Sequence, residues 1–110
     1  HNLPALERLV EFIQSQNDKE CLLLCGALKR KDDSAMLSYL REALPNVQLT
    51  VTSFSDGDSL GQAEAEGFLY IEDYRQLIQN FQERQNDNQL LFITGSLYFI
   101  AEIRAYLTSL

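Results

Sequence analysis

The sequence predicts an α/β domain, in which a mostly parallel sheet carries helices on both of its faces. Segments with apolar residues at helical spacing alternate along the chain with short, unbroken apolar runs. Unbroken runs are typical of strands that are covered on both faces, and such strands occur mainly in parallel sheets. The 110 residues, of which 45 % are hydrophobic and 23 % charged, suffice for one core. We therefore expect residues 1–110 to form a single domain.

The first element is a predicted helix over residues 3–16. Its apolar residues, among them Leu9 and Ile13, recur at helical spacing. Residues 21–25 (C-L-L-L-C) follow as a predicted strand that ends at Gly26. A βαβ unit begins with a strand, yet this chain begins with a helix. We therefore expect that a preceding first strand is missing and that the chain is a fragment of a longer protein.

The middle of the chain contains a second helix, two strands and a long polar segment. The helix is predicted over residues 33–44, and Pro45 ends it. Residues 47–52 are rich in β-branched side chains and are predicted to form a strand. Residues 53–67 combine glycines with acidic residues and are interpreted as a mobile acidic loop, and residues 68–71 are predicted to form a third strand.

The last part of the chain repeats the alternation. Asp73 is predicted to cap a helix that ends near Arg84. Residues 90–93 are predicted to form the fourth strand, and residues 94–96 a tight turn. A final helix is expected over residues 97–110.

The charge balance excludes several classes of partner. Sixteen acidic residues oppose nine basic ones, which gives a net charge of −7. Nucleic-acid-binding proteins normally carry a basic surface, and anionic membranes also attract one. No apolar run reaches the roughly 20 residues of a transmembrane helix. We therefore expect no nucleic-acid partner and no membrane partner.

The cysteines and the single histidine do not suggest a disulfide or a metal site. Cys21 and Cys25 lie four residues apart on one predicted strand, about 13 Å from each other. A disulfide needs Cα atoms roughly 4.4–6.8 Å apart, so both thiols are expected to be free, as in a reducing cytoplasm. Residues 56–67 do not fit a calcium-binding EF-hand, because Leu60 and Gly67 stand where ligands are needed.

The candidate site lies where the predicted strands end, because ligands of open α/β sheets bind at the carboxyl ends of the strands. Three segments qualify, namely residues 26–32, residues 94–96 and residues 1–2. Ser96 opens the last helix, and the free N–H groups of a helix start bind anions. On this local evidence alone, an ordinary strand-to-helix turn with a serine cap is the favoured interpretation of Ser96.

The cations at residues 29–31 follow the first predicted strand. Lys29 is a candidate for binding a phosphate or a carboxylate, and Asp32 is a candidate contact beside it. A solvated loop with an aspartate that caps the next helix is the alternative for both residues. Arg30 and Lys31 are interpreted as part of a solvated loop.

Three segments of the chain resemble the motifs of one enzyme family. Residues 91–104 (L-F-I-T-G-S-L-Y-F-I-A-E-I-R) resemble a closing signature in which an apolar strand precedes T-G-S-(L/F)-Y and a helix with (E/D)-(V/I)-R. Residues 25–32 (C-G-A-L-K-R-K-D) are similar to an F-G-A-(L/M)-K-D-K-D segment, and residues 1–4 (H-N-L-P) resemble the end of a D-G-A-H-N-P motif. By these motifs the chain resembles the folylpolyglutamate synthases of the Mur-ligase family.

The resemblance implies a Rossmann-like C-terminal domain of a larger ligase, alone or combined with dihydrofolate synthase activity. Such enzymes use ATP and Mg²⁺ to activate a folate carboxylate as an acyl phosphate, which the amine of glutamate attacks. By the same resemblance His1 and Ser96 are catalytic, and Lys29, Asp32 and Gly95 contact the cofactor. The N-terminal ATPase domain of the same enzyme would bind most of the ATP and Mg²⁺, so the 110 residues alone are expected to be inactive, and the enzyme cytoplasmic.

The chain also departs from the family pattern. Arg30 replaces the usual aspartate, the D-G-A half of the first motif is absent, and residues 53–67 lack the family's Pro-Arg-Ala. Two other functions remain open: a Mur-type ligase that uses another amino acid, and a receiver-like interaction module without catalysis. A receiver needs an aspartate at the end of a central strand and a lysine late in the chain, whereas Cys25 ends the strand here and no lysine follows Lys31.

Overall fold

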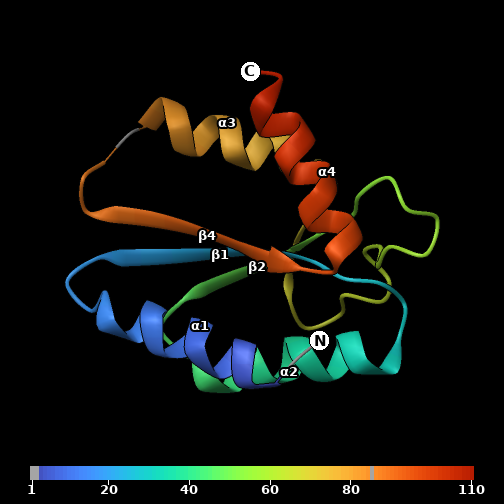
Figure 1. Ribbon diagram of the computed structural model, residues 1–110, viewed down its shortest axis with the longest axis horizontal. Helices are drawn as coiled ribbons and strands as arrows, with labels where there is room; N and C mark the ends of the chain where they lie inside the picture. The colour runs from blue at the N-terminus through green and yellow to red at the C-terminus, as the bar shows by residue number, and fades with distance from the viewer. Residues whose placement is uncertain (1–2, 85) are drawn as a thin grey trace.

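The computed structural model describes residues 3–84 and 86–110, and it confirms the predicted α/β architecture (Figure 1). The bounds of the elements lie close to those predicted from the sequence. In chain order, the described residues form α1 (Leu3–Ser15), β1 (Glu20–Gly26), α2 (Lys31–Ala43), β2 (Gln48–Thr52), β3 (Leu69–Ile71), α3 (Tyr74–Arg84), β4 (Gln89–Gly95) and α4 (Leu97–Thr108).

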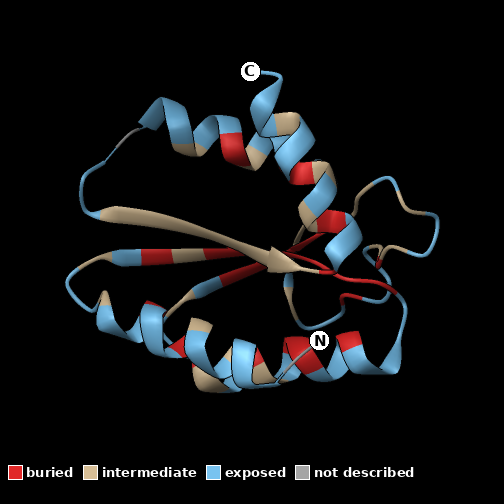
Figure 2. Cartoon of the chain, viewed as in Figure 1, coloured by how far each residue is buried: buried red, intermediate tan, exposed pale blue. Residues whose placement is uncertain are grey.

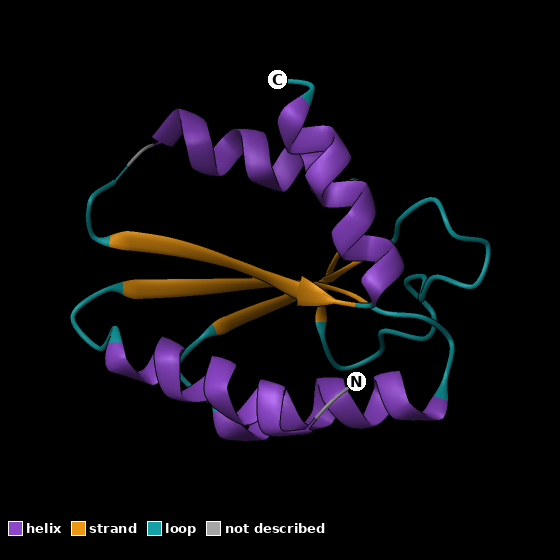
Figure 3. Ribbon diagram, in the orientation of Figure 1, coloured by secondary structure: helices purple, strands orange, loops and turns teal. Residues whose placement is uncertain are grey.

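The four strands form one sheet in the order β3-β2-β1-β4, and every neighbouring pair is parallel. Helices α1 and α2 cover one face of this sheet, and α3 and α4 cover the other (Figure 3). The prediction of a mostly parallel sheet with helices on both faces is therefore confirmed, and the arrangement is Rossmann-like.

Strand β1 lies inside the sheet and supplies the centre of both cores. Cys21, Leu23 and Cys25 pack toward α1 and α2. Leu24 packs on the opposite face, against the core that includes Phe99 of α4. Both cysteines are buried and free, as expected. The unbroken apolar run of β1 thus reflects burial on two faces.

Strand β4 is apolar as well, but it is less buried than β1. Every residue of β4 is half-buried, whereas most of β1 is buried (Figure 2). The reason is its position, because within the described residues β4 pairs with β1 alone and lies at the edge of the sheet. The local sequence pattern does not distinguish this edge strand from a central one.

The segment between β2 and β3, interpreted from the sequence as a mobile acidic loop, is packed against the domain. Leu60 and Ala65 are 4 % and 2 % exposed, respectively, so the segment contributes to the core. Ser59 also forms an isolated antiparallel bridge with Leu28, just after β1. Residues 53–68 therefore pack against the carboxyl end of the sheet.

Among the described residues, no helix combines the length and the apolar character that crossing a membrane requires.

Two glycines allow β1 and β4 to meet closely at their carboxyl ends. Gly26 and Gly95 are partners in the sheet register. A Cβ atom on Gly95 would lie 2.1 Å from the carbonyl oxygen of Gly26, and Gly95 has a φ of +138°, which side chains rarely tolerate. A Cβ atom on Gly26 would lie 2.3 Å from Cγ of Phe99. Both positions therefore require glycine.

We expect the substitution Gly95→Ala to lower the free energy of unfolding by about 3 kcal/mol, because it adds backbone strain and a backbone clash. Gly57→Ala is the matched control, since a Cβ atom on Gly57 would meet nothing within 4 Å. Its effect should stay within about 0.5 kcal/mol. Urea denaturation followed by circular dichroism measures both values, and equal stabilities of the two variants would contradict the close approach.

Candidate functional site

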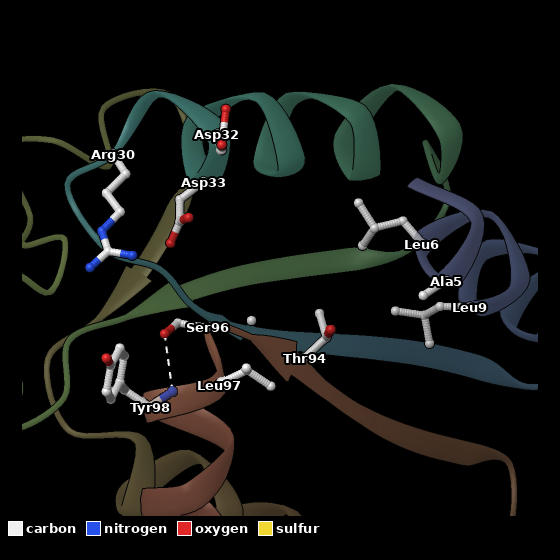
Figure 4. Close-up of a pocket in the computed structure, with 11 residues that line it drawn as sticks. Ala5, Leu6, Leu9, Arg30, Asp32, Asp33, Thr94, Ser96, Leu97 and Tyr98 are labelled. Carbon is white, nitrogen blue, oxygen red and sulfur yellow. Dashed lines mark hydrogen bonds between the residues drawn. The ribbon is translucent and has the colours of Figure 1, made fainter. Parts of the chain in front are cut away.

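The neighbouring strands β1 and β4 lead to opposite faces of the sheet. Helix α2 follows β1 on one face, and α4 follows β4 on the other. In open α/β sheets, ligands bind where neighbouring strands diverge in this way. A crevice of about 810 Å³ lies at that place (Figure 4). We call it the switch-point crevice. The residues that line it are Ala5, Leu6, Leu9, Arg30, Asp32, Asp33, Thr94, Gly95, Ser96, Leu97 and Tyr98.

Ser96 joins the crevice to the start of α4. Its backbone N–H donates to the carbonyl oxygen of Gly26 over 2.9 Å, which confirms that the two strand ends converge. Its hydroxyl oxygen accepts the N–H of Tyr98 over 3.1 Å and so caps α4. The cap uses the oxygen as an acceptor and leaves the hydroxyl proton able to donate to a bound group. Ser96 is therefore a helix cap and also a candidate ligand contact.

The cation that lines the crevice is Arg30, although the sequence favoured Lys29. The Lys29 ammonium lies 3.5 Å from a carboxylate oxygen of Glu64, outside the crevice lining. Arg30 occupies the N-cap position of α2 in an extended conformation, and Figure 4 shows its guanidinium directed toward the start of α4. In residues 25–32, Arg30 stands where the resembling family has aspartate. This departure from the family pattern is the sequence signal that could have identified Arg30 as a crevice residue.

The two aspartates after Arg30 have different roles. Asp33 is 3 % exposed, and its carboxylate accepts the N–H of Leu28 over 2.7 Å. It thereby fixes the turn that follows β1. The N-cap residue of α2 is Arg30, not one of the two aspartates, and the Arg30 side chain makes no capping hydrogen bond. Asp32 is exposed and lines the crevice, and its predicted contact with a cofactor stays a prediction. Both lie in the first turn of α2, where the helix dipole favours negative charge.

Two further residues, Gly95 and His1, were predicted to belong to the site. Gly95 lines the crevice beside Ser96. His1 lies outside the described residues, so its predicted catalytic role stays a prediction. Thr94 and Tyr98 also line the crevice, although their motif alone does not predict a separate role for either residue.

The two thiols of β1 are poor nucleophiles. Burial, followed by the nearby carboxylate of Asp33, raises the pKa of Cys25 to about 12. Burial also raises the pKa of Cys21. Both thiols are therefore protonated at neutral pH. The described lining residues include no histidine or cysteine.

Comparison of the chain with protein-family models, curated proteins and solved structures found no match. The geometry of the crevice and the resemblance of the sequence motifs therefore carry the functional argument.

We expect Asp33→Ala to destabilise the domain by about 2 kcal/mol, because it removes the acceptor of a buried backbone N–H group. Asp32→Ala removes the same charge from an exposed neighbouring position and should change stability by about 0.5 kcal/mol or less. Thermal or urea denaturation of the two variants provides the measurement. Similar losses in both variants would show that the Asp33–Leu28 hydrogen bond contributes little.

Proposed function

We propose that this chain is the C-terminal domain of an ATP-dependent ligase that adds glutamate to folate. One observation carries the proposal. The two segments that resemble folylpolyglutamate synthases, residues 25–32 and residues 91–104, are distant in the sequence but meet at the switch-point crevice. The Gly26–Gly95 pair joins them. Residues that belong to one functional signature are expected to converge in this way.

The charges of the crevice suit an amino acid. Arg30 and the start of α4 can bind a carboxylate, the former by paired hydrogen bonds and the latter through the hydroxyl proton of Ser96 and the positive end of the helix dipole. Two carboxylates line the same crevice: Asp33 is buried and accepts the N–H of Leu28, whereas Asp32 is exposed and suits an ammonium group. This mixture fits a zwitterion such as glutamate better than a polyanion such as ATP. We therefore assign the glutamate subsite to Arg30, Asp32 and Ser96.

Among the described residues, no group of three histidine, cysteine, aspartate or glutamate side chains is placed to hold a metal ion. The proposal, following the resemblance, places Mg²⁺ and the phosphate groups of ATP on the N-terminal ATPase domain. The role of this chain is then to hold and orient glutamate while the two domains close and exclude water.

The alternatives make different demands on the same residues. A Mur-type ligase of another pathway would use the crevice for a different amino acid. A receiver-like module would need a phosphate-accepting aspartate where Cys25 stands, and Cys25 is fully buried. The folate pathway and the two free thiols fit a cytoplasmic enzyme, which is part of the proposal.

In the full-length polypeptide that contains this chain, we expect Arg30→Ala to raise the KM for glutamate at least tenfold, because the substrate carboxylate loses its cation. Lys31→Ala is the matched control, since Lys31 is an exposed cation beside Arg30 that does not line the crevice. ATP-dependent ligation of glutamate to a reduced folate, followed by mass spectrometry of the product, measures both. A panel of amino acids in the same assay separates glutamate from the substrates of other Mur-type ligases. Equal KM values for both variants would remove Arg30 from the site.

Ser96→Ala should lower the rate of glutamate addition while the domain stays folded, because the lost cap accounts for only about 1 kcal/mol. Circular dichroism verifies the fold, and the ligation assay measures the rate. The 110-residue chain alone should show no turnover of ATP in that assay. Ligation by the isolated chain would overturn the two-domain proposal, and unchanged kinetics of Ser96→Ala would remove Ser96 from the site.

A further inference from the structure

One carboxylate outside the crevice connects three separate parts of the chain. Glu102 of α4 accepts the hydroxyl of Tyr74 with Oε2 over 2.9 Å. Its other oxygen, Oε1, accepts the backbone N–H of Ser55 over 3.0 Å. Tyr74 is 2 % exposed, and burial together with the hydrogen bond to Glu102 raises the pKa of Tyr74 to about 12. The tyrosine is therefore a permanent donor at neutral pH, and Glu102 ties α4 to α3 and to the β2–β3 connection.

The β2–β3 connection in turn holds the segment that carries Arg30. The N–H of Leu60 donates to the carbonyl oxygen of Ala27 over 2.8 Å. The N–H of Lys29 donates to the carbonyl oxygen of Asp58, also over 2.8 Å. These two bonds fix the backbone on the N-terminal side of Arg30 to residues 58–60.

These contacts form a closed ring of chain segments, the contact ring. The contact ring runs from Gly26 through Ser96 and α4 to Glu102, and from there through residues 55–60 back to Ala27. The side chain of Phe99 packs inside it, since the centroid of the Phe99 side chain lies 5.1 Å from that of Phe54 and 5.8 Å from that of Tyr74. Because these aromatic side chains occupy the interior, the two sides of the contact ring cannot approach each other.

We propose that Glu102 is a positioning residue for the switch-point crevice. It does not line the crevice, but its bond to Ser55 closes the contact ring that sets the position of Arg30 relative to Ser96. The consequence for glutamate binding rests on the proposed function, whereas the contact ring itself does not. Loss of Glu102 should free residues 58–60 from α4 and loosen the segment that leads to Arg30.

The first test measures backbone amide exchange in the 110-residue chain by NMR. Glu102→Ala should accelerate the exchange of the Lys29 and Leu60 amides at least tenfold relative to the Leu24 amide in the core. Glu83→Ala is the matched control, because it removes an equal charge from an exposed position on α3. Glu102→Gln retains an oxygen acceptor near Ser55 and should restore most of the protection. An unchanged ratio, or the same acceleration at all three amides, would overturn the proposal.

The second test separates positioning from a merely structural role in the full-length enzyme. Glu102→Ala should raise the KM for glutamate several-fold, and Glu102→Gln should bring it back toward the wild-type value. If Arg30→Ala raises this KM but Glu102→Ala does not, the positioning role is wrong. If neither variant changes the KM for glutamate, the proposed glutamate subsite is wrong. The amide exchange then still tests whether Glu102 closes the contact ring.

Discussion

The close approach of β1 and β4 at Gly26 and Gly95 is the constraint on which the rest of the carboxyl edge depends. It brings the carbonyl oxygen of Gly26 within reach of the Ser96 N–H, so that α4 begins directly over the end of β1. It also lets the ring of Phe99 pack against the backbone of Gly26. A Cβ atom on Gly95 would collide with the backbone of β1, and one on Gly26 would collide with the aromatic ring of Phe99. The turn, the helix start and the core beneath them therefore form one cooperative unit.

The fold could be predicted because burial determines the sequence pattern of most elements. The apolar run of β1 and the helical spacing in α1 and α2 are direct consequences of packing on a two-faced sheet. The edge position of β4 could not be predicted, since strand order depends on long connections and leaves no local pattern. The packing of residues 53–68 was missed for a related reason, because the polar residues of this segment conceal two isolated core residues, Leu60 and Ala65.

The site was predictable where backbone geometry alone creates it. Gly26, Gly95 and Ser96 converge because parallel strands end at one edge of the sheet. The sequence could not predict which of the two adjacent cations, Lys29 or Arg30, lines the crevice. Adjacent side chains point in different directions, and the direction of Lys29 depends on a residue that is distant in the sequence. Glu64, on the β2–β3 connection, pairs with Lys29 and leaves Arg30 to face the crevice.

The net charge of −7 does not prevent this edge from binding a carboxylate, because several acidic groups already have local donors. The Gly61 N–H and the ammonium of Lys29 lower the pKa of Glu64, and Asp56 accepts the N–H of Asp58. Glu102 is occupied by Ser55 and Tyr74. These bonds hold the carboxylates in place, and solvent ions screen the electrostatic potential of the carboxylates beyond about 10 Å. Under the proposed function, selectivity depends on the groups that line the crevice itself. There the guanidinium of Arg30 and the start of α4 lie beside the exposed carboxylate of Asp32, a combination that suits the amino acid proposed as the substrate.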